Sequence, residues 1–545
     1  MKLLIAGFIF LIQMFSFANG DRIKNLPIQD SGRIKPFDSF ARESLELIYG
    51  RSQFKRPNSD QKEPAHLIIL SFLLSPESWI NIELFEVGNL ELKKKLSLKE
   101  DQKYFKGNDL FNSESFRNLM QELENKRQAK EKLDPFFQAV QRLENQFFTF
   151  QNISSGKMLR VLPGINVDAW RSVQELPEKY QNKFISISQE LARFLGAQAQ
   201  DKENIQSAGL KLDQTVDDFI QSAAAEFPNY ANQKKISAEV FYNQFHFFRW
   251  AYIFYLLAAL LLLIVWIRDL DKVMSLTWIL SFIGLAIHTS GFVFRIYLAE
   301  RPPVTNMYET VVWVSWGTVV FSMILEKIYK YKSILFAGLL SGVFAMVVAD
   351  MAPAILDPSI QPLEAVLRSN YWLIIHVMTI TISYAAFLLA FALGDIGLIY
   401  HVLDSEKHKE VIRNISTAIY RAMQIGVAFL APGIILGGVW ADYSWGRFWG
   451  WDPKETWALI VLLGYIIILH TKLINWIQNF GMMVSAVVAF NLVIMAWYGV
   501  NFVLGAGLHS YGFGAGGVEY VAVFSILHLL FVIYASVVKK LQSAK

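Results

Sequence analysis

The chain has 545 residues, of which 53% are hydrophobic and 14% aromatic, and its formal net charge is only +4. The charged fraction of 18% lies below the roughly 25% typical of soluble proteins, and no basic stripe with interleaved aromatic residues suggests a nucleic-acid partner. The absence of cysteine excludes disulfides, thiolate metal sites and a CxxCH segment, which leaves the nine histidines as the leading candidate metal ligands.

The first 20 residues have the organisation of a secretory signal peptide. Lys2 precedes an apolar run from Leu3 to Phe17, and the small residues Ala18 and Gly20 follow. An uncleaved anchor helix is the alternative interpretation. Under either interpretation, the chain from Asp21 onward lies outside the cytoplasm.

Residues 21–245 are rich in Lys, Glu, Gln and Asn and predict an extracytoplasmic, mainly helical domain. Apolar residues recur at helical spacing in Phe37–Tyr49, in 114–147 and in 184–196. This region contains no internal repeat and no catalytic motif. We interpret it as a docking or spacer module.

Residues 246–545 predict a polytopic α-helical membrane domain. The cationic residues in the predicted inner connections outnumber those in the outer connections by 12 to 4, as the positive-inside rule requires. Nine apolar segments have about the length needed to span a bilayer: 247–267, 274–298, 309–326, 333–350, 371–400, 418–440, 456–474, 480–504 and 518–538.

The outer connection between the sixth and seventh segments runs from Trp445 to Glu455 and reads WGRFWGWDPKE. Tryptophan is ordinary at a membrane interface. Trp445, Trp449 and Trp451, with Trp440 just before them, exceed an ordinary aromatic belt, which remains the alternative. Two glycines let the backbone approach a flat group. The loop therefore predicts a site at which indole rings stack on an apolar macrocycle.

Charged residues complete the prediction for this loop. Arg447 and Lys454 are placed to pair with the propionate carboxylates of a haem. Asp452 has the character of an N-cap, and Pro453 can begin the next helix. We expect Asp452 and Glu455 to position the loop rather than to transfer protons.

Two histidines flank the loop in the sequence and share its side of the membrane. His376 lies near the outer end of the fifth segment, and His509 lies just beyond the eighth. Two neutral imidazoles on opposite faces of a macrocycle are suitable axial ligands for haem iron. The outer connection 301–309, which reads RPPVTNMYE, is rigid and polar, and we expect it to help close the site.

Other histidines lie deeper in the predicted bundle. His470 is about 14 residues into the seventh segment, or roughly 21 Å from the outer face, and an ionisable group at that depth suggests a function. It could bind a second haem or the same haem in transit. His288, with Arg295 two turns on, and His528 are also intramembrane, and structural roles for them are as plausible as ligation.

At these residues the chain resembles the haem-handling proteins that share the WWD loop, WGxxWxWDPxE, and within them the CcsA (ResC) family of the system II cytochrome c synthase. The match at Trp445–Glu455 is complete, and the resemblance is strong over 247–538 and patchy before it. Further stretches that carry it are PPVTNMYET at 302–310, IIHVMTITISYAAF at 374–387, ETWALIVLLGYIIILHTKL at 455–473, GLHSYGFG at 507–514 and, weakly, GRIKPFDSFARESL at 32–45.

The resemblance implies a membrane protein of the bacterial inner (cytoplasmic) membrane whose WWD loop and N-terminal domain are periplasmic. His376 and His509 match the external haem ligands, and His470 matches an intramembrane histidine that binds haem b before outward delivery. The partner of that histidine belongs to a ResB (CcsB) component, which is expected as a separate subunit unless His288 substitutes. The chain would then be the haem-binding component of a holocytochrome c synthase (haem lyase), which attaches haem to the CxxCH segment of apocytochrome c.

An alternative function is a haem exporter or chaperone that only delivers haem, because related CcmC and CcmF proteins also carry the loop. Nine spans and a large outer domain make the chain too long for a CcmC-type chaperone. Nine spans are too few for CcmF. A quinone-linked carrier with b haems would need histidine pairs stacked within the bundle, whereas the best pair here lies at the outer surface.

Overall fold

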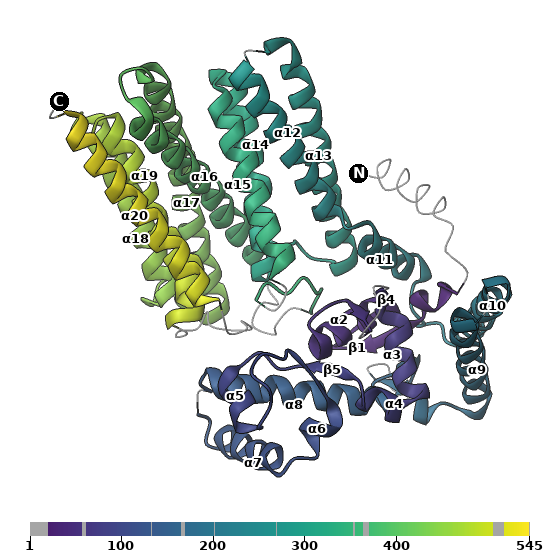
Figure 1. The fold of residues 1–545 in the computed structure, drawn as a ribbon. Coiled ribbons are helices and arrows are strands. Elements are labelled where there is room, and N and C mark those ends of the chain that lie inside the picture. Colours follow the sequence, from purple (N-terminus) through teal and green to yellow (C-terminus); the bar gives the residue numbers. More distant parts are fainter. Residues whose placement is uncertain are drawn as a thin grey trace. The chain divides into compact units, whose positions relative to one another are not determined.

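The computed structural model describes residues 20–56, 62–131, 133–164, 169–200, 202–268, 270–352, 355–362, 370–504 and 517–543. The chain divides into two compact units, Met1–Phe245 and His246–Lys545 (Figure 1). The predicted signal peptide or anchor, apart from Gly20, lies outside the described residues, and so does His509.

Helices dominate the first unit, and short antiparallel hairpins link them. The sequence did not predict the hairpins, which are β1 (Pro27–Asp30) with β2 (Arg33–Pro36), β3 (Gln53–Lys55) with β4 (Lys62–Pro64), β5 (Glu83–Glu86) with β6 (Tyr104–Lys106), and β7 (Arg160–Pro163) with β8 (Trp170–Ser172). The helices are η1 (Arg22–Asn25), α2 (Phe37–Tyr49), α3 (Ala65–Leu74), α4 (Pro76–Ile80), α5 (Leu90–Lys95), α6 (Gly107–Phe111), α7 (Glu114–Gln128), α8 (Pro135–Ser154), η2 (Val173–Glu175), α9 (Glu178–Gln200), α10 (Lys202–Glu226) and α11 (Gln233–Phe245).

The predicted helix at Phe37–Tyr49 is confirmed as α2. The predicted helical stretch 114–147 is two helices, because Asp134 accepts a hydrogen bond from the Phe137 amide at 2.8 Å and Pro135 begins a new helix.

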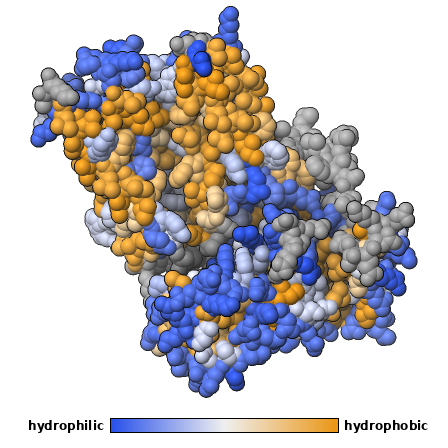
Figure 2. Space-filling model, viewed as in Figure 1, coloured by the Kyte–Doolittle hydropathy of each residue, from blue (hydrophilic) through white to orange (hydrophobic). Residues whose placement is uncertain are grey.

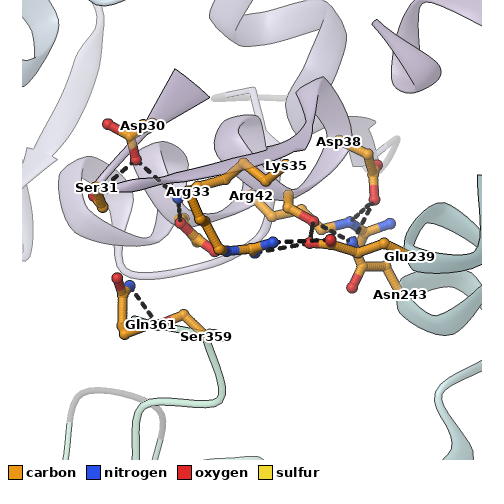
Figure 3. Close-up of polar contacts among 12 residues, drawn as sticks. Asp30, Ser31, Arg33, Lys35, Asp38, Arg42, Glu239, Asn243, Ser359 and Gln361 are labelled. Carbon is orange, nitrogen blue, oxygen red and sulfur yellow. Dashed lines mark hydrogen bonds and ion pairs between the residues drawn. The ribbon is translucent and has the colours of Figure 1, made fainter. Parts of the chain in front are cut away.

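A buried polar network holds three elements of the first unit together. Arg33 of β2 donates two hydrogen bonds, of 2.9 and 2.8 Å, to the carboxylate of Glu239 on α11 (Figure 3). Lys35, whose side chain is fully buried, donates to Asp30 at 2.8 Å and to Glu43 of α2 at 2.5 Å. Buried charges are tolerated when each has an opposite partner, so the network fixes the β1–β2 hairpin against α2 and α11.

The second unit is a bundle in which the described residues form nine apolar helices long enough to cross a membrane. This confirms the predicted polytopic helical fold. Its elements are α12 (Phe247–Arg268), η3 (Asp271–Val273), α13 (Met274–Ala299), α14 (Met307–Tyr329), α15 (Lys332–Met351), α16 (Asn370–Asp404), α17 (Lys409–Trp445), α18 (Pro453–Leu473), α19 (Asn479–Ile494), the π-helix η5 (Met495–Leu504) and α20 (Val518–Ser543). Figure 1 shows them running alternately up and down the bundle.

Two of these elements differ from the sequence prediction. The sixth segment was expected to end at residue 440, but α17 continues to Trp445, where Gly446 adopts a left-handed conformation with φ 68°. Trp445 is therefore in the last turn of a helix rather than in the loop. The eighth segment ends as a π-helix, a rare form that often occurs at functional sites.

Hydrophobic residues cover most of the visible face of the second unit, with hydrophilic patches at its ends, whereas hydrophilic residues cover most of the visible face of the first unit (Figure 2). Among the candidate spans, α18 and α20 are the least enclosed, with 17% and 11% of their apolar windows buried. Most of their side chains thus face outward, toward lipid or another membrane subunit.

Candidate functional site

A cavity of about 190 Å³ lies where α14, α16, α17, α18 and η5 meet. Most of its wall is apolar, formed by aliphatic and aromatic side chains, and a smaller set of polar groups lies among them. The wall includes Ile374, Val377, Ile380, Tyr384, Met307, Ile434, Trp440, Phe448, Trp449 and Trp497, with the polar residues Arg301, Thr305, Asn306, Thr310, His376, Thr381, Lys454, Glu455 and Asn501.

His376 of α16 lines this cavity in a defined orientation. Its Nδ1 lies 2.8 Å from the carbonyl oxygen of Gly433 on α17. Because a carbonyl can only accept, Nδ1 carries the proton of the neutral ring and Nε2 keeps its lone pair. The ring is nearly parallel to that of Trp440, with centroids 6.2 Å apart and planes at 12°. A metal-binding imidazole is commonly fixed in this way by a hydrogen bond from its other nitrogen.

Glycine on α17 makes room for this imidazole. A Cβ atom at Gly437 would lie 2.4 Å from Cε1 of His376, and one at Gly438 would lie 2.5 Å from the ring of Phe448. Both distances are below ordinary contact, so any larger residue would displace the facing ring. The Gly437-Gly438 pair therefore sets how closely His376 and the loop approach the helix.

The three tryptophans at and beyond the end of α17, Trp445, Trp449 and Trp451, have different environments. Trp449 lines the cavity and meets Trp451 edge to face, with centroids 5.8 Å apart. Trp451 is 70% exposed and has a left-handed backbone with φ 56°, a strained conformation for a large residue. Trp445 lies behind the cavity wall, packed at 4.7 Å against the buried ring of Trp440.

Glu455 is the residue that holds the loop in shape. One of its oxygens accepts the amides of Gly450 and Asp452 at 2.8 and 3.1 Å, and the other accepts from Arg447 at 3.0 Å. Asp452 in turn caps α18 by accepting the Lys454 amide at 3.0 Å, which confirms the predicted N-cap. Arg447 and Asp452 thus support the loop from outside the cavity wall, whereas Lys454 is part of that wall.

The outer connection 301–309, which was expected to help close the site, forms the other polar part of the wall, and no individual roles were predicted for its charged residues. Glu309, fully enclosed, lies 2.7 Å from Nε of Arg295 and 3.3 Å from Arg301, and it accepts the amide and the hydroxyl of Thr305 at 2.8 Å each. Arg301 lines the cavity. The sequence signal was the rigid, polar character of this connection, which did not distinguish Arg301 from its neighbours.

Of the other predicted histidines, neither His470 nor His288 is part of the described cavity wall. His470 is exposed in the last turn of α18, the end remote from Pro453, with Nδ1 2.8 Å from the Ile466 carbonyl. His288 is fully buried on α13, 3.3 Å from the hydroxyl of Tyr255 and stacked on Phe292 at 5.2 Å.

Residues 304–509 match the family model described as cytochrome C assembly protein. The chain is 35% identical over 291 residues to the cytochrome c biogenesis protein CcsA of Mesostigma viride, which covers 47% of this chain and 94% of that protein. It is 32% identical over 256 residues to the protein of the same name from Parasynechococcus marenigrum strain WH8102, covering 42% and 83% of the two chains.

A longer match reaches into the first unit. The protein NrfI of Wolinella succinogenes is 27% identical over 514 residues, covering 89% of this chain but 53% of NrfI. The chain therefore spans about half the length of that relative. Since 89% of the chain is more than the second unit alone, the similarity includes much of residues 20–245.

Proposed function

This chain belongs to the CcsA family of cytochrome c biogenesis proteins, and we propose that it holds haem b in the cavity beside His376 for attachment to apocytochrome c. It is a multi-pass membrane protein of cytochrome c biogenesis. In the proposed arrangement, it lies in a bacterial cytoplasmic membrane with the cavity and the first unit on the periplasmic side.

The observation that carries the proposal is the tautomer and position of the His376 imidazole. Its Nδ1 donates a hydrogen bond to the Gly433 carbonyl, so Nε2 is the nitrogen whose lone pair would bind iron. The ring lines a cavity with mainly apolar walls. An unprotonated imidazole nitrogen in a preformed apolar cavity is the donor that haem iron requires. His509 is the proposed second ligand, as the sequence predicts.

The cavity is large enough to enclose only part of a haem macrocycle. About 190 Å³ is less than the roughly 300–1,000 Å³ of sites that bury a whole drug-sized ligand. Phe448 and Trp451 are 50% and 70% exposed beside it and offer apolar faces against which the remainder of the ring can lie. A haem left partly open is accessible to an incoming CxxCH segment.

His470 is placed to bind haem before it reaches the cavity, together with a ligand from a second chain. It is exposed on α18, one of the two least enclosed helices, so an external ligand can reach its ring. We propose that a ResB-like membrane subunit supplies the second ligand for haem at His470, and that haem then passes outward to the cavity. His288 is enclosed by Phe248, Tyr255 and Phe292, and we assign it no ligand role in this scheme.

In the proposed attachment, the histidine of the CxxCH segment displaces one protein ligand from ferrous haem. Each cysteine thiol then adds across a vinyl group: sulfur bonds to one vinyl carbon and the proton ends on the other, with no net oxidation. The chain contributes position and exclusion of water. Asp452 and Glu455 take no part as acids or bases, because both are committed to the loop.

The test is co-expression of the full chain with a reporter apocytochrome, with and without a ResB-like subunit, in cells that lack other maturation systems. We expect covalent haem staining of the reporter only when both subunits are present. Haem-loaded membranes that never mature the reporter would instead identify a chaperone that only delivers haem. A double substitution of His376 and His509 that left the haem spectrum unchanged would contradict the ligand assignment.

A further inference from the structure

We propose that Arg301 and Lys454 form the carboxylate-binding end of the cavity and recognise the two propionates of haem, an inference that rests on the proposed function. The sequence assigned this role to Arg447 and Lys454. In the structure Arg447 supports the loop through Glu455 and lies outside the described cavity wall, whereas Arg301, from a connection about 150 residues away, is part of that wall.

Arg301 is a built part of the site rather than a mobile surface cation. It is only 7% exposed, its NH1 lies 3.3 Å from Glu309, and its NH2 donates to the carbonyl oxygen of Gln361 at 2.7 Å. These two contacts hold the planar guanidinium against the cavity. A preorganised guanidinium with several N–H donors is suited to a carboxylate, because little freedom is lost on binding.

A second arginine stabilises this arrangement. Arg295 bonds the other oxygen of Glu309 at 2.7 Å and donates to the carbonyl oxygens of Pro358 and Ser359 at 2.9 and 3.1 Å. One carboxylate is therefore shared by two guanidinium groups. Arg295 also ties the connection 355–362 to the same cluster, so Arg301 is supported from both sides.

Two helix N-termini also lie at the cavity wall. Asn306 caps α14, and Asp452 caps α18; Asn306, Met307 and Lys454 all line the cavity. The backbone amides at a helix start carry partial positive charge and favour an anion. Lys454, in the first turn of α18, adds a full charge there. The acidic side chain in this part of the wall, Glu455, already accepts three hydrogen bonds from the loop.

The cavity thus has mainly apolar walls, one imidazole and two cationic side chains, a composition that suits a flat apolar macrocycle that carries two carboxylates. Charge pairing is stronger beside apolar walls than in water, so the cations contribute to orientation as well as to affinity. Orientation matters because the vinyl groups must face the incoming thiols.

The test compares haem with haem dimethyl ester, which has the same ring and iron but no propionate charge. Each is titrated into the purified full chain, and binding is followed by the Soret band. We expect the wild type to bind haem more tightly than the ester. Arg301→Gln and Lys454→Gln should each weaken haem binding about tenfold or more and leave binding of the ester nearly unchanged.

Arg249→Gln is the matched control, because that arginine of α12 pairs with Asp350 away from the cavity wall. It should leave both affinities at the wild-type value. If Arg301→Gln weakens haem and ester equally, the residue has only a structural role; if it weakens neither, the cation serves another anion, such as a lipid phosphate. Either result overturns this inference alone, whereas a wild type that binds neither compound would overturn the proposed function.

Discussion

Two intramembrane histidines of the second unit have similar sequence surroundings and different structural ones. His376 lies on a cavity, with one ring nitrogen bonded to the Gly433 carbonyl and its face toward Trp440. His288 is sealed among Phe248, Tyr255 and Phe292. Both are histidines on long apolar helices, so a position within such a helix does not by itself identify a haem ligand. Access to a cavity and a fixed tautomer are the features on which the proposed role of His376 rests.

Gly437→Ala tests whether the space beside α17 holds His376 in place for haem binding. The added methyl group would lie 2.4 Å from the His376 ring and must push it away from α17. We expect haem affinity to fall by about tenfold or more, because overpacking costs about 1–3 kcal/mol and each 1.4 kcal/mol is tenfold in affinity. Haem titration with Soret detection measures this. Gly464→Ala, whose methyl would meet only the end of Leu492, is the matched control and should bind haem normally.

His288→Ala tests whether His288 has a structural role without binding haem. Removing a fully buried ring leaves a hole among aromatic neighbours, so we expect the unfolding free energy to drop by on the order of 2–5 kcal/mol. Haem affinity should stay within twofold, measured on folded protein below the unfolding transition. A His288→Ala protein that kept its stability but lost haem would make His288 a ligand and reverse the comparison.

Glu455→Gln tests the loop that faces His376. The neutral amide cannot satisfy Arg447 and two backbone amides as a carboxylate does, so the loop should loosen. We expect a loss of about 1–3 kcal/mol in stability. Increased hydrogen exchange at the Gly450 and Asp452 amides is the readout. Unchanged exchange at both amides would show that Glu455 does not hold the loop.

His66 of the first unit is a buried histidine that should make the stability of that unit depend on pH. Burial lowers its pKa from 6.5 to about 3. Between these two pH values the unfolded chain binds a proton at His66 and the folded protein does not. Stability is therefore full well above pH 6.5 and is lost as the pH falls toward 3, by about 1.4 kcal/mol at pH 5.5. Hydrogen exchange in α3, corrected for pH, should show this loss, and His66→Gln should reduce it. An identical pH profile in the variant would assign the loss to other groups.

The sequence could predict whatever depends on neighbours along the chain. The bounds of α2, the cap at Asp452 and the nine apolar helices follow from local spacing and capping. The hairpins of the first unit have strands of three or four residues, too short for a clear alternation. Trp445 was assigned to a loop because the apolar pattern of the sixth segment ends at residue 440, whereas the helix continues until Gly446 ends it.

The candidate site was harder to predict because it is assembled from distant segments. The tryptophan-rich loop and His376 could be proposed from composition and predicted sidedness. The contribution of Arg301 could not, because it depends on the ion pair with Glu309 and on the packing of α14 against the neighbouring helices. The different surroundings of His288 and His376 are likewise visible only in three dimensions.

The most direct measurement of the central claim is the absorption spectrum of haem bound to His376→Ala, with and without added imidazole and beside His288→Ala. We expect His376→Ala to lose the low-spin ferrous spectrum, imidazole to restore it by entering the vacated position, and His288→Ala to keep the wild-type spectrum. A His376→Ala protein with an unchanged haem spectrum would show that His376 is not a haem ligand.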